Sequence, residues 1–214
     1  MKGVAGMIFV ASTVLAASFA QAQADGRIAS SAESVRPLGV GDVVPEVELR
    51  SVARLPAGLR ALVDRQPTVL VFYRGGWCPY CNTQLSGLKK IEGALGELGY
   101  QLVAISPDKP EKLAESVGKQ NLGYTLLSDS TADAIKAFGL AFRVDDATLE
   151  RYRGFGIDLE QASGAGHHLL PVPAVYVVDT SGRIRFAYWN ADYKQRLDAD
   201  AVVDAARAAA PRRD

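Results

Sequence analysis

The chain has 214 residues, of which 48% are hydrophobic, and its 24 basic side chains balance 24 acidic ones, so the formal net charge is zero. This length is sufficient to bury one substantial core and favours a single domain. Without a basic surplus, the chain lacks the electrostatic signature of a nucleic-acid-binding protein.

Residues 1–24 have the pattern of a secretory signal peptide. Lys2 is followed by an uncharged stretch rich in Ala, Val, Leu and Phe, and then by small residues at alternating positions. We expect cleavage after Ala22 or Ala24. An uncleaved membrane anchor is the alternative, because the uncharged run approaches the roughly 20 residues of a transmembrane helix. Either way we expect the domain outside the cytoplasm, in the bacterial periplasm, where a dithiol stays reduced only if a partner keeps reducing it.

Residues 25–40 are polar, small and aperiodic, which predicts a flexible lead-in to a folded domain spanning residues 41–210. Val44–Leu49 alternates like a strand, and Ala57–Arg65 is a candidate for a short helix. Pro67–Tyr73 is a continuous apolar, β-branched run, which is typical of a buried central strand.

A long helix is predicted after the cysteines, ending near Gly99, because leucine and isoleucine recur at helical spacing. The chain then alternates between strands and helices. The expected elements are a strand at Tyr100–Ser106, a helix at Lys109–Gln120 with Pro110 in its first turn, a strand at Tyr124–Asp129, a helix at Ser130–Gly139 opened by a capping serine or threonine and closed by Gly139, a hairpin at Ala174–Trp189, and a closing helix at Asp198–Ala210.

This order of elements predicts an α/β fold with a mixed central sheet flanked by helices on both faces. Residues 141–171 fit the alternation least well. They are rich in Arg, Asp and Gly and contain both histidines of the chain, so we expect a partly helical excursion near the active end.

The two cysteines of the chain, Cys78 and Cys81, occur together in the stretch RGGWCPYC, so no separate disulfide framework exists. Cys78 follows a buried strand by a Gly-Gly turn, and Cys81 falls in the first turn of the next helix. Unpaired N–H groups and the helix dipole favour a thiolate there, and the thiolate is the attacking species in redox chemistry. Pro79 is tolerated so early in a helix.

Three further residues are candidates for supporting roles. Arg74 can add positive charge near the thiols, or it can be a solvated strand end; Trp77 can shield the site, or it can be a packed aromatic. Pro173 directly precedes a strand, where a cis bond would bring backbone against the cysteine pair and a trans bond would simply begin the strand.

Metal binding is the competing interpretation of the cysteine pair. The only histidines, His167 and His168, lie far downstream and are adjacent to each other, and there is no second C-x-x-C, which disfavours a structural zinc site. A copper-binding module using Cys78, Cys81 and one histidine remains as a non-enzymatic alternative.

Five stretches, in order, carry a family resemblance: GDVVPEVEL, VLVFYRGGWCPYC, AISPDKPEKL, YTLLSDSTADAIKAFGL and PAVYVVDTSGRIRF. From about Gly41 to Ala209 the chain resembles the peroxiredoxins and peroxiredoxin-like proteins of the alkyl hydroperoxide reductase/thiol-specific antioxidant family, within the thioredoxin-fold superfamily. The resemblance implies a single thioredoxin-like domain.

The resemblance implies two different assignments of the cysteines. Against peroxiredoxins, Cys81 matches the peroxide-attacking cysteine and Cys78 stands where those enzymes have threonine or serine. Against thioredoxins, Cys78 is the attacking cysteine and Cys81 the resolving one. Pro173 falls where a typical peroxiredoxin has its catalytic arginine and thioredoxins have a cis-proline, so Arg74 or Arg143 would have to substitute for that arginine electrostatically.

The expected function is therefore that of a thiol-dependent antioxidant oxidoreductase. It would reduce hydroperoxides through a Cys78/Cys81 dithiol–disulfide cycle, with Cys81 attacking and Cys78 resolving, and a thioredoxin-like dithiol would restore the pair. No organic cofactor or metal is required. An exported thioredoxin-like disulfide reductase, in which Cys78 attacks a protein disulfide, is the alternative enzyme.

Overall fold

A seven-stranded mixed sheet forms the centre of the structure, a computed structural model that describes residues 28–210. The predicted signal peptide and its cleavage sites lie outside the described residues. Within residues 28–210, no helix is both long enough and apolar enough to cross a membrane. In sheet order the strands are β2 (Pro56–Gly58), β1 (Glu48–Ser51), β5 (Thr125–Ser128), β4 (Gln101–Ser106), β3 (Thr68–Phe72), β8 (Ala174–Val178) and β9 (Ile184–Trp189).

The central strand β3 pairs in parallel with β4 and antiparallel with β8. Every residue of β3 is buried, because helices cover both faces of the sheet at this strand. Burial on both faces explains why its sequence is a continuous apolar run rather than an alternating one. The mixed sheet confirms the predicted fold class.

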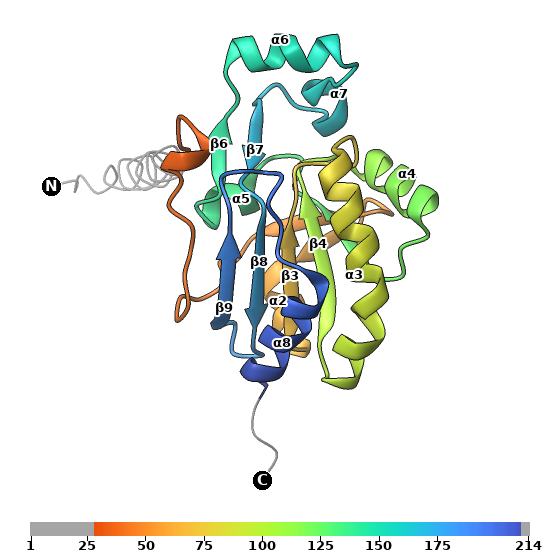
Figure 1. Ribbon diagram of the computed structural model, residues 1–214, viewed down its shortest axis with the longest axis vertical. Helices are drawn as coiled ribbons and strands as arrows, with labels where there is room; N and C mark the ends of the chain where they lie inside the picture. The colour runs from red at the N-terminus through yellow and green to blue at the C-terminus, as the bar shows by residue number, and fades with distance from the viewer. Residues whose placement is uncertain (1–27, 211–214) are drawn as a thin grey trace, which may run out of the picture.

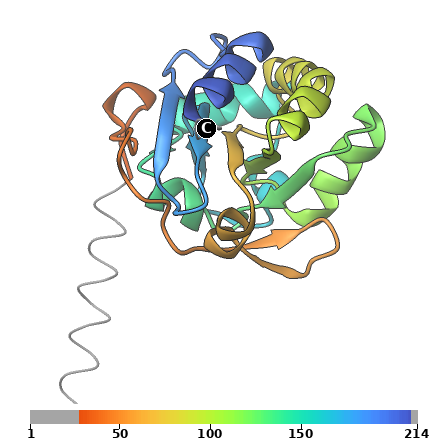
Figure 2. The same cartoon turned by 90° about the horizontal axis from the view of Figure 1, so that it is seen from below.

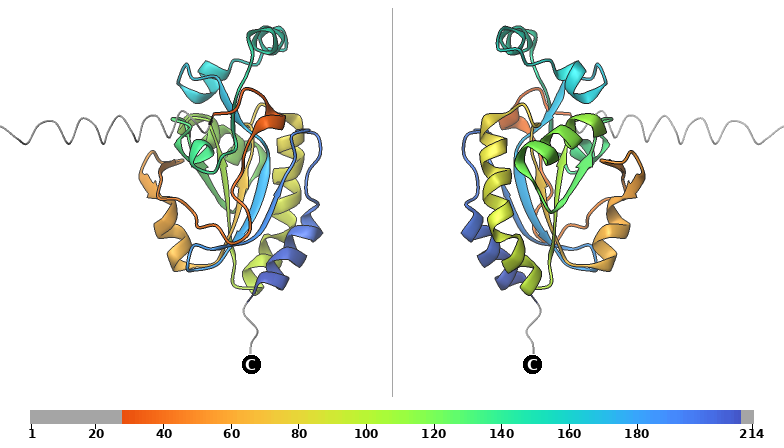
Figure 3. Two further views of the ribbon diagram at one scale, coloured as in Figure 1. Left: turned by 90° about the vertical axis from the view of Figure 1, so that its left-hand side faces the viewer. Right: turned by 90° about the vertical axis from the view of Figure 1, so that its right-hand side faces the viewer.

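Two helical layers cover the sheet, as Figures 2 and 3 show. Helices α3 and α8 pack on one face, and α2 packs on the other. The core on the α3 face also includes Leu113 of α4, and the opposite core includes Ile135 of α5. The bounds are α2 (Leu59–Arg65), α3 (Pro79–Glu97), α4 (Pro110–Gln120), α5 (Asp133–Ala137) and α8 (Ala199–Ala209).

Residues 141–171 form an excursion beyond one end of the sheet (Figure 1). Strands β6 (Ala141–Arg143) and β7 (Leu169–Pro171) make a separate antiparallel pair, and α6 (Asp146–Gly154) and α7 (Leu159–Ser163) lie between them. Helix α3 begins at this same end, so the excursion stands beside the cysteine motif.

The residues before the sheet differ from the expected flexible lead-in. The short 3₁₀ helix η1 (Ala32–Ser34) lies among residues that bond to the rest of the domain. Ala29 exchanges backbone hydrogen bonds with Ala141 and Arg143, and Val35 is buried in the core. The polar composition of this segment predicts flexibility because it contains few apolar side chains. Several of those side chains pack against the rest of the domain, which a local pattern does not indicate.

Two local expectations also differ from the structure. Helix α5 has Ala132 as its N-cap, not a serine or threonine, and the buried carboxylate of Asp129 accepts the Ala134 and Ile135 amides instead. The alternating run at Val44–Leu49 becomes a strand only from Glu48 onward. The cap was missed because its acceptor lies before the helical turn, in the loop that leaves β5.

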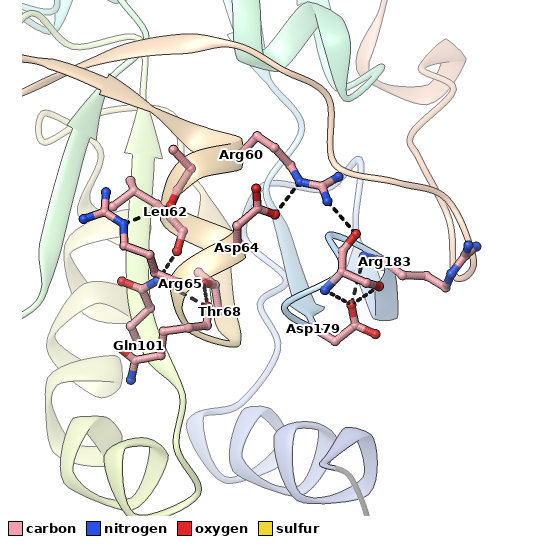
Figure 4. A network of polar contacts seen from close by, with 11 residues as sticks. Arg60, Leu62, Asp64, Arg65, Thr68, Gln101, Asp179 and Arg183 are labelled. Carbon is pink, nitrogen blue, oxygen red and sulfur yellow. Dashed lines mark hydrogen bonds and ion pairs between the residues drawn. The ribbon is translucent and has the colours of Figure 1, made fainter.

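At the end of the sheet away from the cysteines, polar contacts join the elements (Figure 4). Gln101 of β4 donates to the Leu62 carbonyl of α2 at 3.0 Å and to the Thr68 hydroxyl of β3 at 2.9 Å. Arg60 of α2 donates to the Ser181 carbonyl, in the β8–β9 turn, at 2.7 Å. These contacts hold α2 against the base of the sheet and leave the opposite end for the site.

Candidate active site

A tight turn connects β3 to α3 and delivers Cys78 to the helix N-cap, with Pro79 at the first helical position. Gly75 has φ +150°, and a Cβ there would lie 2.3 Å from the Trp77 Nε1 atom. The Gly76 amide donates to the buried Asp108 carboxylate at 2.7 Å. The turn therefore requires glycine and is held by an aspartate that sequence analysis did not select.

The two cysteines are free thiols in this structure, and their side chains are 1% and 0% exposed. Hydrogen bonding from the Cys81 thiol lowers the pKa of Cys78 to about 6, and the Cys81 amide, Arg74 and Arg196 act in the same direction against the effect of burial. Burial and the neighbouring Cys78 raise the pKa of Cys81 well above its usual range. In this pair a thiolate is therefore favoured at Cys78 over Cys81.

Arg74 is only 4% exposed and lies within an aromatic cage. Its guanidinium carbon is 4.1 Å from the ring centroid of Tyr193, 5.1 Å from that of Trp77 and 5.5 Å from that of Tyr152. The Nη2 atom of Arg74 donates a hydrogen bond to the Tyr152 hydroxyl. Cation–π contacts of this kind stabilise a desolvated guanidinium. The structure thus places the Arg74 charge where it lowers the pKa of Cys78.

Trp77 connects the turn to the excursion. Its ring is partly buried and lies 5.7 Å from the Tyr152 ring of α6, in addition to its contact with Arg74. Packing and shielding are therefore performed by the same side chain, and the two interpretations of Trp77 are not exclusive.

Pro173 directly precedes β8, and the peptide bond before it is trans, because residues 28–210 contain no cis peptide bond. The proline nevertheless lies at the site. Together with Arg74 and Tyr193 it borders a cavity of about 560 Å³, which extends under the excursion to Arg143 and Arg151.

Arg196 is a second residue that sequence analysis missed, after Asp108. Its Nη2 lies 3.4 Å from Cys81 Sγ, and its Nη1 donates to Gln84 Oε1 at 3.2 Å. No local pattern marks it, since 115 positions separate it from Cys81. Arg143, which the sequence offered as a substitute cation, lines the same cavity and donates to the His167 carbonyl.

The histidines do not form a metal site with the thiols. His167 accepts from the Leu169 amide through Nδ1, which leaves Nε2 to donate to the Ser130 carbonyl. His168 pairs with Glu160 at 2.6 Å. Among the described residues, no group of three or more potential side-chain ligands gathers that could hold a metal ion. The copper-binding alternative is not favoured, because both ring nitrogens of His167 already have backbone partners.

A buried thiol–thiolate pair at the start of a helix, on a sheet of this topology, defines a thioredoxin-fold thiol oxidoreductase. Comparison with known proteins gives the family. The model of the AhpC/TSA family matches residues 40–187. Peroxiredoxin Bcp of Escherichia coli is 32% identical over 106 residues, which are 50% of this chain and 67% of the relative.

Solved structures agree on the fold. Peroxidoxin BcpB from Mycobacterium tuberculosis superposes with a TM-score of 0.62 at 23% identity, over 80% of this chain and 97% of that one. Reduced Prx3 from Vibrio vulnificus, solved in complex with H₂O₂, gives a TM-score of 0.65 at 18% identity, over 79% of this chain and 99% of the other.

The chain belongs to the AhpC/TSA family, and it is a thiol-dependent peroxidase of the peroxiredoxin type. This confirms the resemblance and the enzyme class predicted from the sequence. The disulfide-reductase and copper-binding alternatives are not favoured.

Proposed function

We propose that the protein reduces hydroperoxides through a Cys78/Cys81 dithiol–disulfide cycle in which Cys78 attacks first. One observation carries this order: Cys78 is the N-cap residue of α3, and there the Cys81 thiol and the Arg74 guanidinium lower the pKa of the Cys78 thiol. The placement against peroxiredoxins predicts the opposite order. Because only a thiolate attacks efficiently, the electrostatics favour the thioredoxin-like order within a peroxiredoxin chain.

The first step breaks the O–O bond. The Cys78 thiolate attacks the terminal oxygen of the hydroperoxide, a sulfenic acid forms on Cys78, and the departing alkoxide takes a proton from solvent to leave as an alcohol. Cys78 is thereby oxidised by two electrons, and the peroxide is reduced by the same two.

The second step closes the disulfide. Cys81 loses its proton and attacks the Cys78 sulfur, the S–O bond breaks, and the departing hydroxide becomes water with the proton that Cys81 released. An external dithiol of the thioredoxin type then reduces the Cys78–Cys81 disulfide by thiol–disulfide exchange. We assign the cavity beside Arg74, Pro173 and Tyr193 as the approach for the peroxide, because Arg74 both lines it and acts on Cys78.

Stopped-flow oxidation by hydrogen peroxide tests the cycle and its order. We expect rapid oxidation of the reduced protein and of Cys81→Ser, with sulfenic acid accumulating in that variant, and slow oxidation of Cys78→Ser. Rapid oxidation of Cys78→Ser alone would reverse the order of attack. Slow peroxide reaction of the intact dithiol, together with fast exchange with a protein disulfide, would overturn the peroxidase itself.

We further propose that the protein is exported and acts in the bacterial periplasm. The charged start, apolar run and small-residue end of residues 1–24 support this. Expression of the full chain in a bacterium, followed by fractionation and mass spectrometry, tests it. A mature chain beginning at Gln23 or Asp25 in the periplasmic fraction is expected, and an intact chain in the cytoplasmic fraction would contradict export.

A further inference from the structure

We propose that Arg196 is a catalytic residue of the resolving step, in which its guanidinium holds Cys81 as the thiolate that closes the disulfide. This inference rests on the proposed function, because it assigns a residue to the second step of that cycle.

The position of Arg196 is specific for Cys81. Its Nη2 is 3.4 Å from Cys81 Sγ, and Gln84, one turn further along α3, accepts from Nη1 and fixes the orientation of the guanidinium. The Nε atom is buried and has no hydrogen-bond partner among the described residues. Among these residues Arg196 is also in no ion pair with a carboxylate, so its charge is available to the sulfur.

The segment that carries Arg196 is anchored to the site. It connects β9 to α8 and comprises residues 190–198, which we call the β9–α8 connection. The Asn190 amide donates to the Pro173 carbonyl, and the Tyr193 ring lies over Arg74 and against Tyr80. The part of the connection that precedes Arg196 is thus held against the site.

The β9–α8 connection also lies beyond the part of the chain that matches the family. That match ends at residue 187, so nothing in it assigns Arg196 a role.

The chemistry requires a cation at Cys81 after the first step. In the resting pair Cys81 keeps its proton because the sulfur is buried and Cys78 carries the charge. Once Cys78 is a neutral sulfenic acid, the repulsion from Cys78 is gone, but burial still disfavours a thiolate at Cys81. Arg196 is the guanidinium in contact with that sulfur, and it lowers the pKa of Cys81.

The two arginines then have different main roles. The Arg74 guanidinium acts on Cys78 and supports the attack on the peroxide. Arg196 contacts Cys81 and supports the resolution, although its charge also reaches Cys78. Loss of Arg196 should therefore slow both steps, but the second step much more than the first.

The experiment follows the two steps separately in the full-length protein carrying Trp189→Phe, so that Trp77 is the single tryptophan. Stopped-flow fluorescence with excess hydrogen peroxide should resolve oxidation of Cys78 and then disulfide formation. In Arg196→Met the second phase should slow by about tenfold or more. The loss of a neighbouring positive charge raises the pKa of a buried thiol by on the order of one unit, so less of Cys81 is present as the attacking thiolate. Arg196→Lys should recover part of the rate.

Lys194→Met is the matched control, because it removes a positive charge from the same connection at an exposed side chain with no contact to either sulfur. It should leave both phases unchanged. A diketone probe for sulfenic acid should label Arg196→Met for longer than the control during turnover.

A direct titration of Cys81 distinguishes the proposed electrostatic role of Arg196 from a purely structural one. In Cys78→Ser, absorbance of the single thiolate at Cys81 should titrate at higher pH when Arg196 is also replaced by Met, and Lys should restore it. Equal slowing of both phases, or an unchanged second phase and titration, would overturn the role of Arg196 while leaving the peroxidase intact. Absence of a fast first phase in the unsubstituted protein would instead overturn the proposed function.

Discussion

Cys81 Sγ lies 3.4 Å from Arg196 Nη2, across 115 positions of sequence. A second guanidinium, that of Arg74 in the β3–α3 turn, acts on Cys78. Two positive charges from distant parts of the chain therefore act on the buried thiol pair. A trans Pro173 stands where the family placement expected an arginine.

The rate of peroxide attack should follow a single ionisation. Hydrogen bonding from Cys81 lowers the pKa of Cys78 to about 6, so the thiolate is present above that pH and is lost as the pH falls through it. We expect the second-order rate constant to be level at pH 7–8 and to fall by about tenfold for each unit well below pH 6. A constant rate down to pH 4, or a rise only above pH 8, would contradict the assignment to Cys78.

Replacing Arg74 should slow the first step. Arg74→Met removes a buried charge that lowers the pKa of Cys78, so the midpoint of the rate profile should move to higher pH and the rate at pH 6 should drop. Arg65→Met, which removes an exposed arginine from α2 at the opposite end of the sheet, is the control and should change neither. An unchanged midpoint in Arg74→Met would show that the aromatic cage serves packing alone.

The β3–α3 turn should tolerate no side chain at Gly75. Gly75→Ala places a Cβ 2.3 Å from Trp77 Nε1 in a backbone conformation that glycine favours, and we expect a loss of about 2 kcal/mol in unfolding free energy and slower peroxide reduction. Gly93→Ala, in α3 with open space around it, should be neutral or slightly stabilising. Urea unfolding compares the two, and equal stability would contradict the packing at the turn.

Asp108 should make the free energy of unfolding depend on pH. Burial raises its pKa to about 7, so the folded protein binds a proton that the unfolded chain releases near pH 4. Its contribution is therefore fully present below the unfolded pKa and is lost as the pH rises through about 7. In urea unfolding between pH 4 and 8, Asp108→Asn should flatten this slope, and an unaltered slope would refute it.

The same residue has a structural role that a second variant isolates. Asn can still accept from the Gly76 amide through its side-chain oxygen, whereas Asp108→Ala leaves that amide without its partner. We expect Asp108→Ala to slow peroxide reduction more than Asp108→Asn does, as measured by stopped flow at pH 7. Equal rates would mean that the hydrogen bond does not position Cys78.

Local patterns predicted most of the architecture. The continuous apolar run of β3 reflects burial on both faces of the sheet, and the leucine spacing of α3 reflects burial that repeats with the helical period. A short window of sequence contains both signals. The exceptions involve partners outside such a window. The Asp129 cap of α5 and the packed residues 28–38 depend on contacts that the fold creates.

The sequence by itself determined the α/β class, the family resemblance and the position of Cys78 and Cys81 at a helix start, because each depends on neighbouring residues or on a colinear series of motifs. Only the tertiary structure decided what surrounds the sulfurs: the aromatic cage of Arg74, the Asp108 anchor and the Arg196 contact. These come from loops that fold back over long separations, and a thiol pKa depends on distance and burial rather than on sequence order.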